Sequence, residues 1–332
     1  MSEFFPSLSR FTGVNELWGF IDTRGRMVIP AEWDMALHYS DGRALVEKDG
    51  LVGFIDERGK VVVPPRYRDA RAYSCGLAAV REDDLWGFID PDGAFAITPR
   101  FHEANPFVAG LAPVLDGKRW GYTDRTGQIA IIARFSAAEI FGERLAPVRI
   151  DGKWGYVDTR GTVVIDPQFE TADRFTEGLA RVSAHGKLGR MYGFIDERGK
   201  TVVPFELKDA EPFREGLAAV RDPIHQTVHF IDRTGKRAFA RNFEVAGSFS
   251  EGLAPVEIGD HQGFIDRGGS TVIPPTFESA GYFSGGLAPV WKGSFLEDDS
   301  RAAFIDRAGH IVIDYLFNDT LGFSNGLAPV CP

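Results

Sequence analysis

The sequence predicts an all-β protein made of nine β-hairpin/meander repeats of about 34 residues, stacked into a closed or nearly closed propeller-like ring. A Trp-Gly-Phe-Ile-Asp-like segment occurs nine times, and a Gly-Leu-Ala-Pro-Val-like segment follows each copy at a fixed distance. Both segments are short and rich in aromatic and β-branched residues, which is typical of strands. One unit is too small to bury its own faces, so its stacked neighbours must complete the core. An open β superhelix is the alternative architecture.

The spacing of the two segments defines the repeat. The residue after the Trp position is Gly19, Gly53, Gly87, Gly121, Gly155, Gly193, His229, Gly263 and Ala303, in steps of 34, 34, 34, 34, 38, 36, 34 and 40 residues. The second segment begins 23 residues later in every unit, so all variation in length lies between it and the next Trp-Gly. We therefore expect an N-terminal lead-in or cap at residues 1–16. A single array should fill residues 17–332, with units starting near Leu17, Leu51, Leu85, Arg119, Lys153, Met191, Thr227, His261 and Arg301.

The first predicted element of each unit is the strand that carries the signature Trp. Trp occupies this position only at Trp18, Trp86, Trp120 and Trp154. We expect these side chains to be structural and buried, so that replacing Trp154 with Ala lowers the free energy of unfolding by about 3–5 kcal/mol. The other units have Val52, Tyr192, Val228, Gln262 and Ala302 there, which argues against a functional role for the Trp.

An Asp-x-x-Gly turn follows this strand in all nine units, and a second apolar run follows the turn. The pattern predicts a β-hairpin, because Gly suits the positive-φ position after a type I turn and the Asp side chain can accept backbone N–H bonds. We therefore expect structural roles for the turn residues, such as Asp22, Asp56, Asp158, Gly25, Gly59 and Gly161. A catalytic or metal-binding Asp is the alternative.

The next element has the pattern aromatic-x-x-Ala-x-x-aromatic, as in Phe101, Ala104 and Phe107. A spacing of three fits neither a strand nor a long helix, so we expect a compact turn whose aromatic rings fill the gap between neighbouring units. An aromatic box that binds a ligand is the alternative. The Gly-Leu-Ala-Pro-Val segment is then the third strand, and its Pro indicates a position whose N–H the ladder does not need.

The end of the array favours closure of the ring. The last unit stops two residues after its Gly-Leu-Ala-Pro-Val segment, without a polar cap, and the segment before Trp18 matches that motif poorly. Residues 327–330 are therefore expected to pair with the first Trp-Gly strand, which would remove both exposed edges. In the alternative, an open superhelix is capped by residues 1–16.

Lys153, Trp154 and Gly155 spell Lys-Trp-Gly, and the pattern around them resembles the WG, or KWG, repeats of bacterial proteins. The resemblance extends over residues 17–330, and nine copies at fixed spacing make it specific. It implies a bacterial origin and a binding or scaffolding role. It supplies no defined substrate and no catalytic site.

Composition and motifs narrow the function. The net charge of −10 argues against nucleic acid as a partner, and no apolar stretch is long enough to span a membrane. There is no signal-peptide pattern, and the two cysteines fit no disulfide framework or zinc pattern, so a cytoplasmic location is expected. We find no phosphate loop and no hydrolase or metalloprotease motif. We therefore expect no enzyme activity, no catalytic or metal-binding residues and no cofactor.

Two features remain as candidate partner-binding sites. The first is a row of arginines one or two residues after the repeated Asp, which stacking would align along one edge as a cationic rim. Its members are Arg24, Arg58, Arg125, Arg160, Arg198, Arg233, Arg267 and Arg307. Such an arginine rim could hold an acidic partner, a phosphorylated segment or a polyanion, whereas turns solvated and paired with nearby carboxylates are the alternative.

The second feature is the opposite edge, where all three insertions fall, at residues 184–190, 221–227 and 291–301. Insertions confined to one face of a repeat array often mark its binding face, although tolerated drift in a loop explains the same pattern. The candidate residues on this insertion edge are His185, Lys187, Arg190, His225, Trp291 and Phe295.

The leading hypothesis is a non-catalytic scaffold that binds a protein partner. A carbohydrate or small-ligand binding module that uses aromatic residues in a central cavity is the second hypothesis, and an enzyme is the third.

Overall fold

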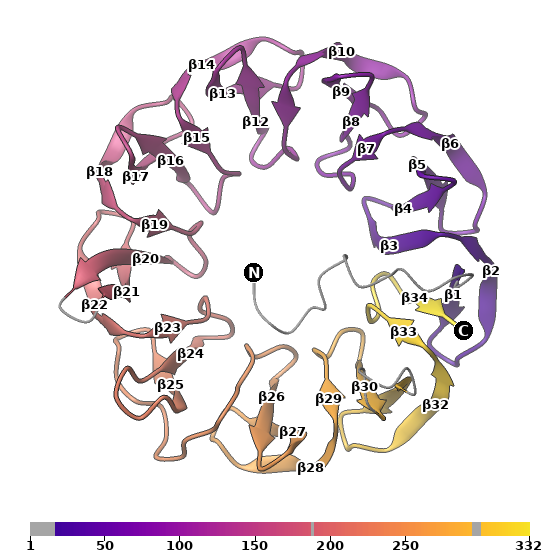
Figure 1. The fold of residues 1–332 in the computed structure, drawn as a ribbon, viewed down its shortest axis with the longest axis vertical. Coiled ribbons are helices and arrows are strands. Elements are labelled where there is room, and N and C mark those ends of the chain that lie inside the picture. Colours follow the sequence, from indigo (N-terminus) through magenta and orange to yellow (C-terminus); the bar gives the residue numbers. More distant parts are fainter. Residues whose placement is uncertain (1–16, 187–188, 294–299) are drawn as a thin grey trace.

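The computed structural model describes residues 17–186, 189–293 and 300–332, and Figure 1 shows these residues arranged as a ring of small antiparallel sheets. The described residues form strands and turns, with no helix. Nine sheets surround a central channel, so the chain is a nine-bladed β-propeller. This confirms the predicted propeller-like ring over the open superhelix.

Each blade runs from a short strand at the channel to a longer strand at the rim of the ring (Figure 1). Blade 1 comprises β3 (Met35–Ser40), β4 (Arg43–Lys48), β5 (Leu51–Asp56) and β6 (Val61–Tyr67); blade 2 comprises β7 (Asp69–Ala70), β8 (Ala78–Glu82), β9 (Leu85–Ile89) and β10 (Phe95–Phe101). Blade 3 comprises β11 (Glu103–Ala104), β12 (Leu111–Asp116), β13 (Arg119–Asp124) and β14 (Ile129–Phe135); blade 4 comprises β15 (Ala137–Ala138), β16 (Ala146–Ile150), β17 (Lys153–Val157) and β18 (Val163–Phe169).

The second half of the ring follows the same plan with two shortened blades. Blade 5 comprises β19 (Thr171–Ala172), β20 (Leu179–Gly186), β21 (Gly189–Asp196) and β22 (Thr201–Leu207); blade 6 comprises β23 (Asp209–Ala210), β24 (Leu217–Arg221) and β25 (Val228–Asp232). Blade 7 comprises β26 (Leu253–Ile258), β27 (His261–Asp266) and β28 (Thr271–Phe277); blade 8 comprises β29 (Ser279–Ala280), β30 (Leu287–Lys292), β31 (Arg301–Asp306) and β32 (Ile311–Phe317). Blade 9 comprises β33 (Asp319–Thr320), β34 (Leu327–Cys331), β1 (Trp18–Asp22) and β2 (Met27–Trp33).

Blade 9 closes the ring by joining the two ends of the described chain. Its two inner strands come from the C-terminal end and its two outer strands from the N-terminal end. Gly19 pairs with Val330 and Asp22 with Leu327, in antiparallel register. The predicted pairing of residues 327–330 with the first Trp-Gly strand is therefore confirmed.

The sequence unit and the blade are offset from one another. A unit that starts at the Trp-Gly strand supplies the two outer strands of one blade and the two inner strands of the next. Every covalent repeat therefore spans a boundary between blades, which ties each blade to its neighbour through the chain itself.

The core lies between adjacent blades. Phe107 follows β11 of blade 3, and its ring centroid lies 4.7 Å from that of Phe88 on β9 of blade 2. Phe101 and Phe107 are both buried in this interface. The aromatics fill the gap between units as expected, but the expected compact turn is wrong in part: Glu103 and Ala104 form the innermost strand by pairing with β12.

The Gly of the Trp-Gly signature allows the outer strand to approach the third strand closely. A Cβ on Gly155 would lie 2.5 Å from the carbonyl oxygen of Ile165, at an irregular step between β17 and β18. Ala303 is accommodated in blade 8, which keeps four strands. His229 occupies this position in blade 6, where the outer segment forms only isolated bridges rather than a strand.

Candidate functional site

The Asp-x-x-Gly turns all lie on one face of the ring, together with the loops that join the first and second strands of each blade. In each turn the Asp carboxylate accepts backbone N–H bonds from the residues two and four positions later. Asp124 Oδ1, for example, accepts from Thr126 N at 2.9 Å and Gln128 N at 3.0 Å. The carboxylate thus holds the turn closed, and the residue beside it is directed to solvent.

The eight rim arginines are all exposed on this face, which we call the arginine face. Within the described residues, only Arg160 among the eight has a carboxylate within 4.0 Å, at 2.9 Å from Asp158. Four of the others extend toward the inner loop of the preceding blade. The Nη2 atoms of Arg125, Arg233, Arg267 and Arg307 lie 3.1–3.5 Å from where a Cβ would project on Gly76, Gly178, Gly216 and Gly252, respectively.

Carboxylates near these arginines are used to join blades. Glu177 of blade 5 accepts the N–H of Gly216 in blade 6 at 2.9 Å, and Glu215 accepts the N–H of Gly252 in blade 7 at 2.9 Å. In the same way, the N–H groups of Gly76, Gly178 and Gly286 donate to the carboxylates of Asp41, Glu143 and Glu251, respectively. The acidic side chains therefore have backbone partners, while the guanidinium groups beside them face solvent.

A groove on the arginine face spans blades 4 and 5. It has a volume of about 520 Å³, and Glu143, Arg144, Asp158, Arg160 and Glu197 contribute its charged groups. Arg144 lies 4.0 Å from Glu197, so this groove is of mixed charge rather than purely basic.

The opposite face carries the turns between the second and third strands and two of the predicted insertion-edge groups. His185 pairs with Arg190 across the extended β20–β21 hairpin of blade 5, and both side chains are exposed. His225 is exposed in the corresponding turn of blade 6. Lys187 and Phe295 lie outside the described residues.

The candidate role of Trp291 as a residue that contacts a partner requires an exposed ring, and the structure does not provide one. Trp291 is only 8% exposed and belongs to the core shared by blades 8 and 9. It pairs across the sheet with Ala302, which occupies the signature Trp position. The indole ring of Trp291 lies on the strand that faces the signature position and fills the space that a signature Trp fills in other blades. Trp291 is therefore not available to contact a partner.

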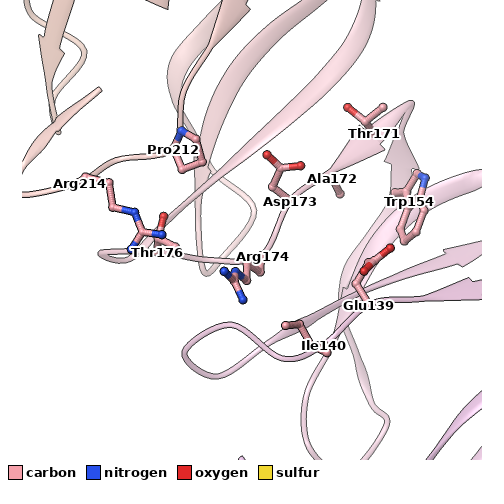
Figure 2. Close-up of a pocket in the computed structure, with 10 residues that line it drawn as sticks. All are labelled: Glu139, Ile140, Trp154, Thr171, Ala172, Asp173, Arg174, Thr176, Pro212 and Arg214. Atoms are coloured by element: carbon pink, nitrogen blue, oxygen red, sulfur yellow. The ribbon is translucent and has the colours of Figure 1, made fainter. Parts of the chain in front are cut away.

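The four signature tryptophans do not share one environment. Trp18 and Trp86 are buried, at 3% and 1% exposure, whereas Trp120 and Trp154 are partly exposed. The expectation of a buried Trp154 is therefore wrong: its ring lines a cavity at the central channel (Figure 2).

This channel cavity has a volume of about 450 Å³ and is shared by three consecutive blades. Blade 4 contributes Glu139, Ile140 and Trp154, blade 5 contributes its inner strand and loop, and blade 6 contributes Pro212 and Arg214. Figure 2 shows Trp154 and Glu139 toward one end and Arg214 toward the other, with Asp173 and Arg174 between them. The full lining is Glu139, Ile140, Trp154, Thr171, Ala172, Asp173, Arg174, Thr176, Pro212 and Arg214.

The carboxyl groups of the channel differ in their partners. Asp173 is paired with Arg181, whose Nε lies 2.6 Å from Asp173 Oδ2. Glu139 has no such partner within the described residues. Its side chain is exposed, but partial desolvation by the surrounding protein raises the pKa of Glu139 above the usual value; the nearby Asp173 carboxylate adds to this rise, and Arg174 opposes it.

The sequence predicts a central cavity with aromatic residues only as the second hypothesis and without identifying its lining, although a signal for the lining was present. The residue after the Ala of the inner segment is acidic in three consecutive units, at Glu139, Asp173 and Glu211. The repeat register places these residues at equivalent positions of blades 4, 5 and 6, beside the channel. The exposure of each signature Trp depends on how neighbouring blades pack, which cannot be predicted from the spacing of the repeats.

The described residues contain no cluster of three or more His, Cys, Asp or Glu side chains that could hold a metal ion. They also contain no helix long and apolar enough to cross a membrane.

The chain belongs to the family of WG containing repeat proteins. The family model matches nine times, at residues 18–51, 53–86, 86–120, 120–154, 154–187, 192–222, 230–260, 263–294 and 303–331. No curated protein matches the sequence.

A solved structure shares this fold at low identity. A crystal structure of a eukaryotic initiation factor is 11% identical, covers 90% of this chain and 84% of its own, and has a TM-score of 0.55. Hsv2 of Kluyveromyces lactis is 11% identical and covers 82% of this chain and 97% of its own, with a TM-score of 0.42. At this identity the initiation factor supports the propeller fold alone.

Proposed function

We propose that this WG-repeat propeller is a non-catalytic scaffold whose arginine face binds an acidic segment of a protein partner. The observation that carries the proposal is the ring of eight exposed arginines, each one or two residues after the turn Asp, in eight of the nine blades. Guanidinium groups form bidentate, charge-assisted bonds with carboxylates and phosphates, so a rigid ring of them suits a Glu-rich, Asp-rich or phosphorylated segment.

Two properties of the chain support a protein rather than a nucleic acid as partner. The net charge of −10 produces long-range repulsion of a polyanionic duplex, whereas a short acidic segment needs only the local positive field of the face. Glu177 and Glu215, which bond to the glycines beside Arg267 and Arg307, already accept backbone N–H bonds from the next blade. Guanidinium N–H groups on this face therefore remain available to hydrogen-bond a carboxylate of the partner.

The test compares two triple variants that change the same number of positive charges. Arg125, Arg233 and Arg267 are changed to Gln on the arginine face, and Lys118, Arg119 and Arg190 are changed to Gln on the opposite face, where all three are exposed. Binding of a fluorescent Glu-rich peptide and of its phosphoserine counterpart is followed by anisotropy at low and physiological salt.

We expect the first triple variant to lose at least about tenfold in affinity, and the second to stay within about twofold of the unmodified protein. Affinity should fall as salt rises, because the contacts are solvent-exposed ion pairs. Equal losses in the two variants would indicate a non-specific charge effect and would contradict the proposal. Absence of binding by either peptide would do so as well.

A further inference from the structure

In two other blades, an arginine side chain stacks on the aromatic residue at the signature position. In blade 2 the guanidinium of Arg71 lies over the ring of Trp86, with its Cζ atom 4.6 Å from the ring centroid. The same guanidinium is 2.8 Å from the carboxylate of Asp69. A cation is thus held between an aromatic face and a carboxylate, and Trp86 is buried beneath it.

Blade 5 repeats this arrangement with different residues. Arg181 lies over Tyr192, which occupies the signature position, at 5.3 Å from Cζ to the ring centroid. Its Nε atom is 2.6 Å from Asp173, and Asp209 of blade 6 is 3.5 Å away. Arg181 occupies the position that is Pro in most Gly-Leu-Ala-Pro-Val segments. The cation of blade 5 therefore belongs to the second strand of its blade, whereas Arg71 follows the first strand of blade 2.

Blade 4 has an aromatic ring, Trp154, and a carboxylate, Glu139, but no cationic side chain at the positions of Arg71 and Arg181. The residue equivalent to Arg71 is Glu139, and the residue equivalent to Arg181 is Pro147. Arg149, which pairs with Trp154 across the sheet, donates instead to the carbonyl oxygen of Gly152 at 3.1 Å. Within the described residues no cationic side chain stacks on Trp154, and its ring lines the channel cavity.

The other end of the cavity carries the opposite charge. Arg174 follows β19 and Arg214 lies in the inner loop of blade 6; both are exposed side chains that line the cavity. Neither has an ion pair within 4.0 Å in the described part of the chain. A ligand in the cavity therefore meets the ring of Trp154 and the carboxylate of Glu139 at one end and the guanidinium groups of Arg174 and Arg214 further along (Figure 2). The Asp173 carboxylate between them is paired with Arg181.

We infer that the channel cavity binds a zwitterionic ligand with a guanidinium or ammonium group over Trp154 and Glu139 and a carboxylate at Arg174 and Arg214. The volume of about 450 Å³ lies within the range of roughly 300–1,000 Å³ typical of small-molecule pockets. Free arginine and the C-terminal arginine of a peptide share this chemistry. The site includes none of the eight rim arginines and does not depend on the proposed function of the arginine face.

The experiment measures binding of L-arginine to the full-length protein by isothermal titration calorimetry. L-Citrulline replaces the guanidinium with a neutral group of the same shape, and agmatine removes the carboxylate. We expect saturable 1:1 binding of L-arginine, and affinities at least about tenfold lower for each of the two analogues. No saturable heat up to about 10 mM L-arginine, or equal binding of citrulline, would overturn the inference.

Paired variants locate the site. Trp154→Ala and Glu139→Gln should each weaken L-arginine binding by about tenfold or more, whereas Trp154→Tyr keeps an aromatic face and should retain binding. Trp120→Ala and Glu57→Gln make the same chemical changes outside the cavity and should leave affinity within about twofold of the unmodified protein. Thermal melts identify any variant that fails to fold. Unchanged binding by folded Trp154→Ala and Glu139→Gln proteins would overturn the assignment.

A peptide ending in arginine distinguishes the two sources of the ligand. Competition between the peptide and L-arginine supports a protein C-terminus as the natural occupant, whereas binding of L-arginine alone supports the free amino acid. Each result depends on the same Trp154 and Glu139 contacts.

Discussion

At the scale of the residue, the same amino acid at equivalent repeat positions has different roles in different blades. Trp86 is covered by Arg71 and buried, whereas Trp154 remains open to the channel cavity. Trp86→Ala should therefore lower the free energy of unfolding by about 3–5 kcal/mol, and Trp154→Ala by clearly less, because less surface is buried. Urea denaturation of the two variants measures the difference. Equal losses would show that the partial exposure of Trp154 has no energetic consequence.

The turn carboxylates predict how stability depends on pH. The Thr126 hydroxyl, 2.7 Å from Asp124 Oδ1, and then backbone N–H groups hold the pKa of Asp124 below its usual value of 3.8. Because the folded pKa is below the unfolded one, the stabilisation is complete above the unfolded pKa and disappears as pH falls through the folded pKa. The stability difference between the unmodified protein and Asp124→Asn should therefore shrink as pH falls from about 5 to 2. Urea midpoints across this range measure it, and a constant difference would contradict the assigned role.

Residue roles set by local chemistry could be predicted from the sequence, whereas those set by neighbouring blades could not. The bonds of Asp124 lie within five residues of chain, and the Asp-x-x-Gly pattern encodes them. The burial of Trp291 depends on Ala302 across the sheet, and the exposure of Trp154 depends on Glu139 rather than an arginine beside it. Such pairs lie in different strands and become visible only once the register is known.

At the scale of the element, the turn glycine serves both the hairpin and the contact between blades. Gly161 has a φ of 79°, and a Cβ there would lie 2.7 Å from Ile131 Cγ2 of the preceding blade. Gly117 has a φ of 64° in a turn of the opposite face, with no atom within 4 Å of such a Cβ. Gly161→Ala should therefore cost roughly 1–2 kcal/mol more than Gly117→Ala, which tests backbone strain alone. Chemical denaturation compares the two, and equal costs would exclude the interblade contact.

The strands of the outer and middle positions could be predicted from their residue patterns, but their grouping into blades could not. The repeat shows which segments recur, but it does not show which consecutive strands belong to the same blade, because the sequence unit and the blade are offset. The innermost strands have only two residues, such as Glu103–Ala104, and are defined by pairing with the next strand rather than by any alternation of their own. For this reason the sequence pattern predicts a compact turn at these residues instead of a strand.

At the scale of the whole molecule, closure depends on a single pair of strands from the two ends of the array. β34 pairs with β1 along four residue pairs, and β33 pairs with β34. Deleting residues 327–332 removes β34 and leaves the edges of β1 and β33 without partners. We expect a lower melting temperature and concentration-dependent self-association, because exposed strand edges pair with other chains.

Deleting residues 184–190 with a two-residue turn in their place is the matched control for this truncation, since it shortens one hairpin without opening the ring. That variant should stay monomeric by light scattering if the full-length protein is monomeric. Equal self-association of both variants would mean that closure does not protect the ring.

The most direct test of the proposed scaffold is labelling of arginine side chains with phenylglyoxal, read by mass spectrometry with and without a saturating Glu-rich peptide. All eight rim arginines are exposed, as are Arg119 and Arg190 on the opposite face, so both groups should react in the free protein. We predict that the peptide protects several rim arginines on adjacent blades and leaves Arg119 and Arg190 reactive. Protection of Arg119 and Arg190 with the rim still reactive would place the binding face on the other side of the ring and contradict the proposal.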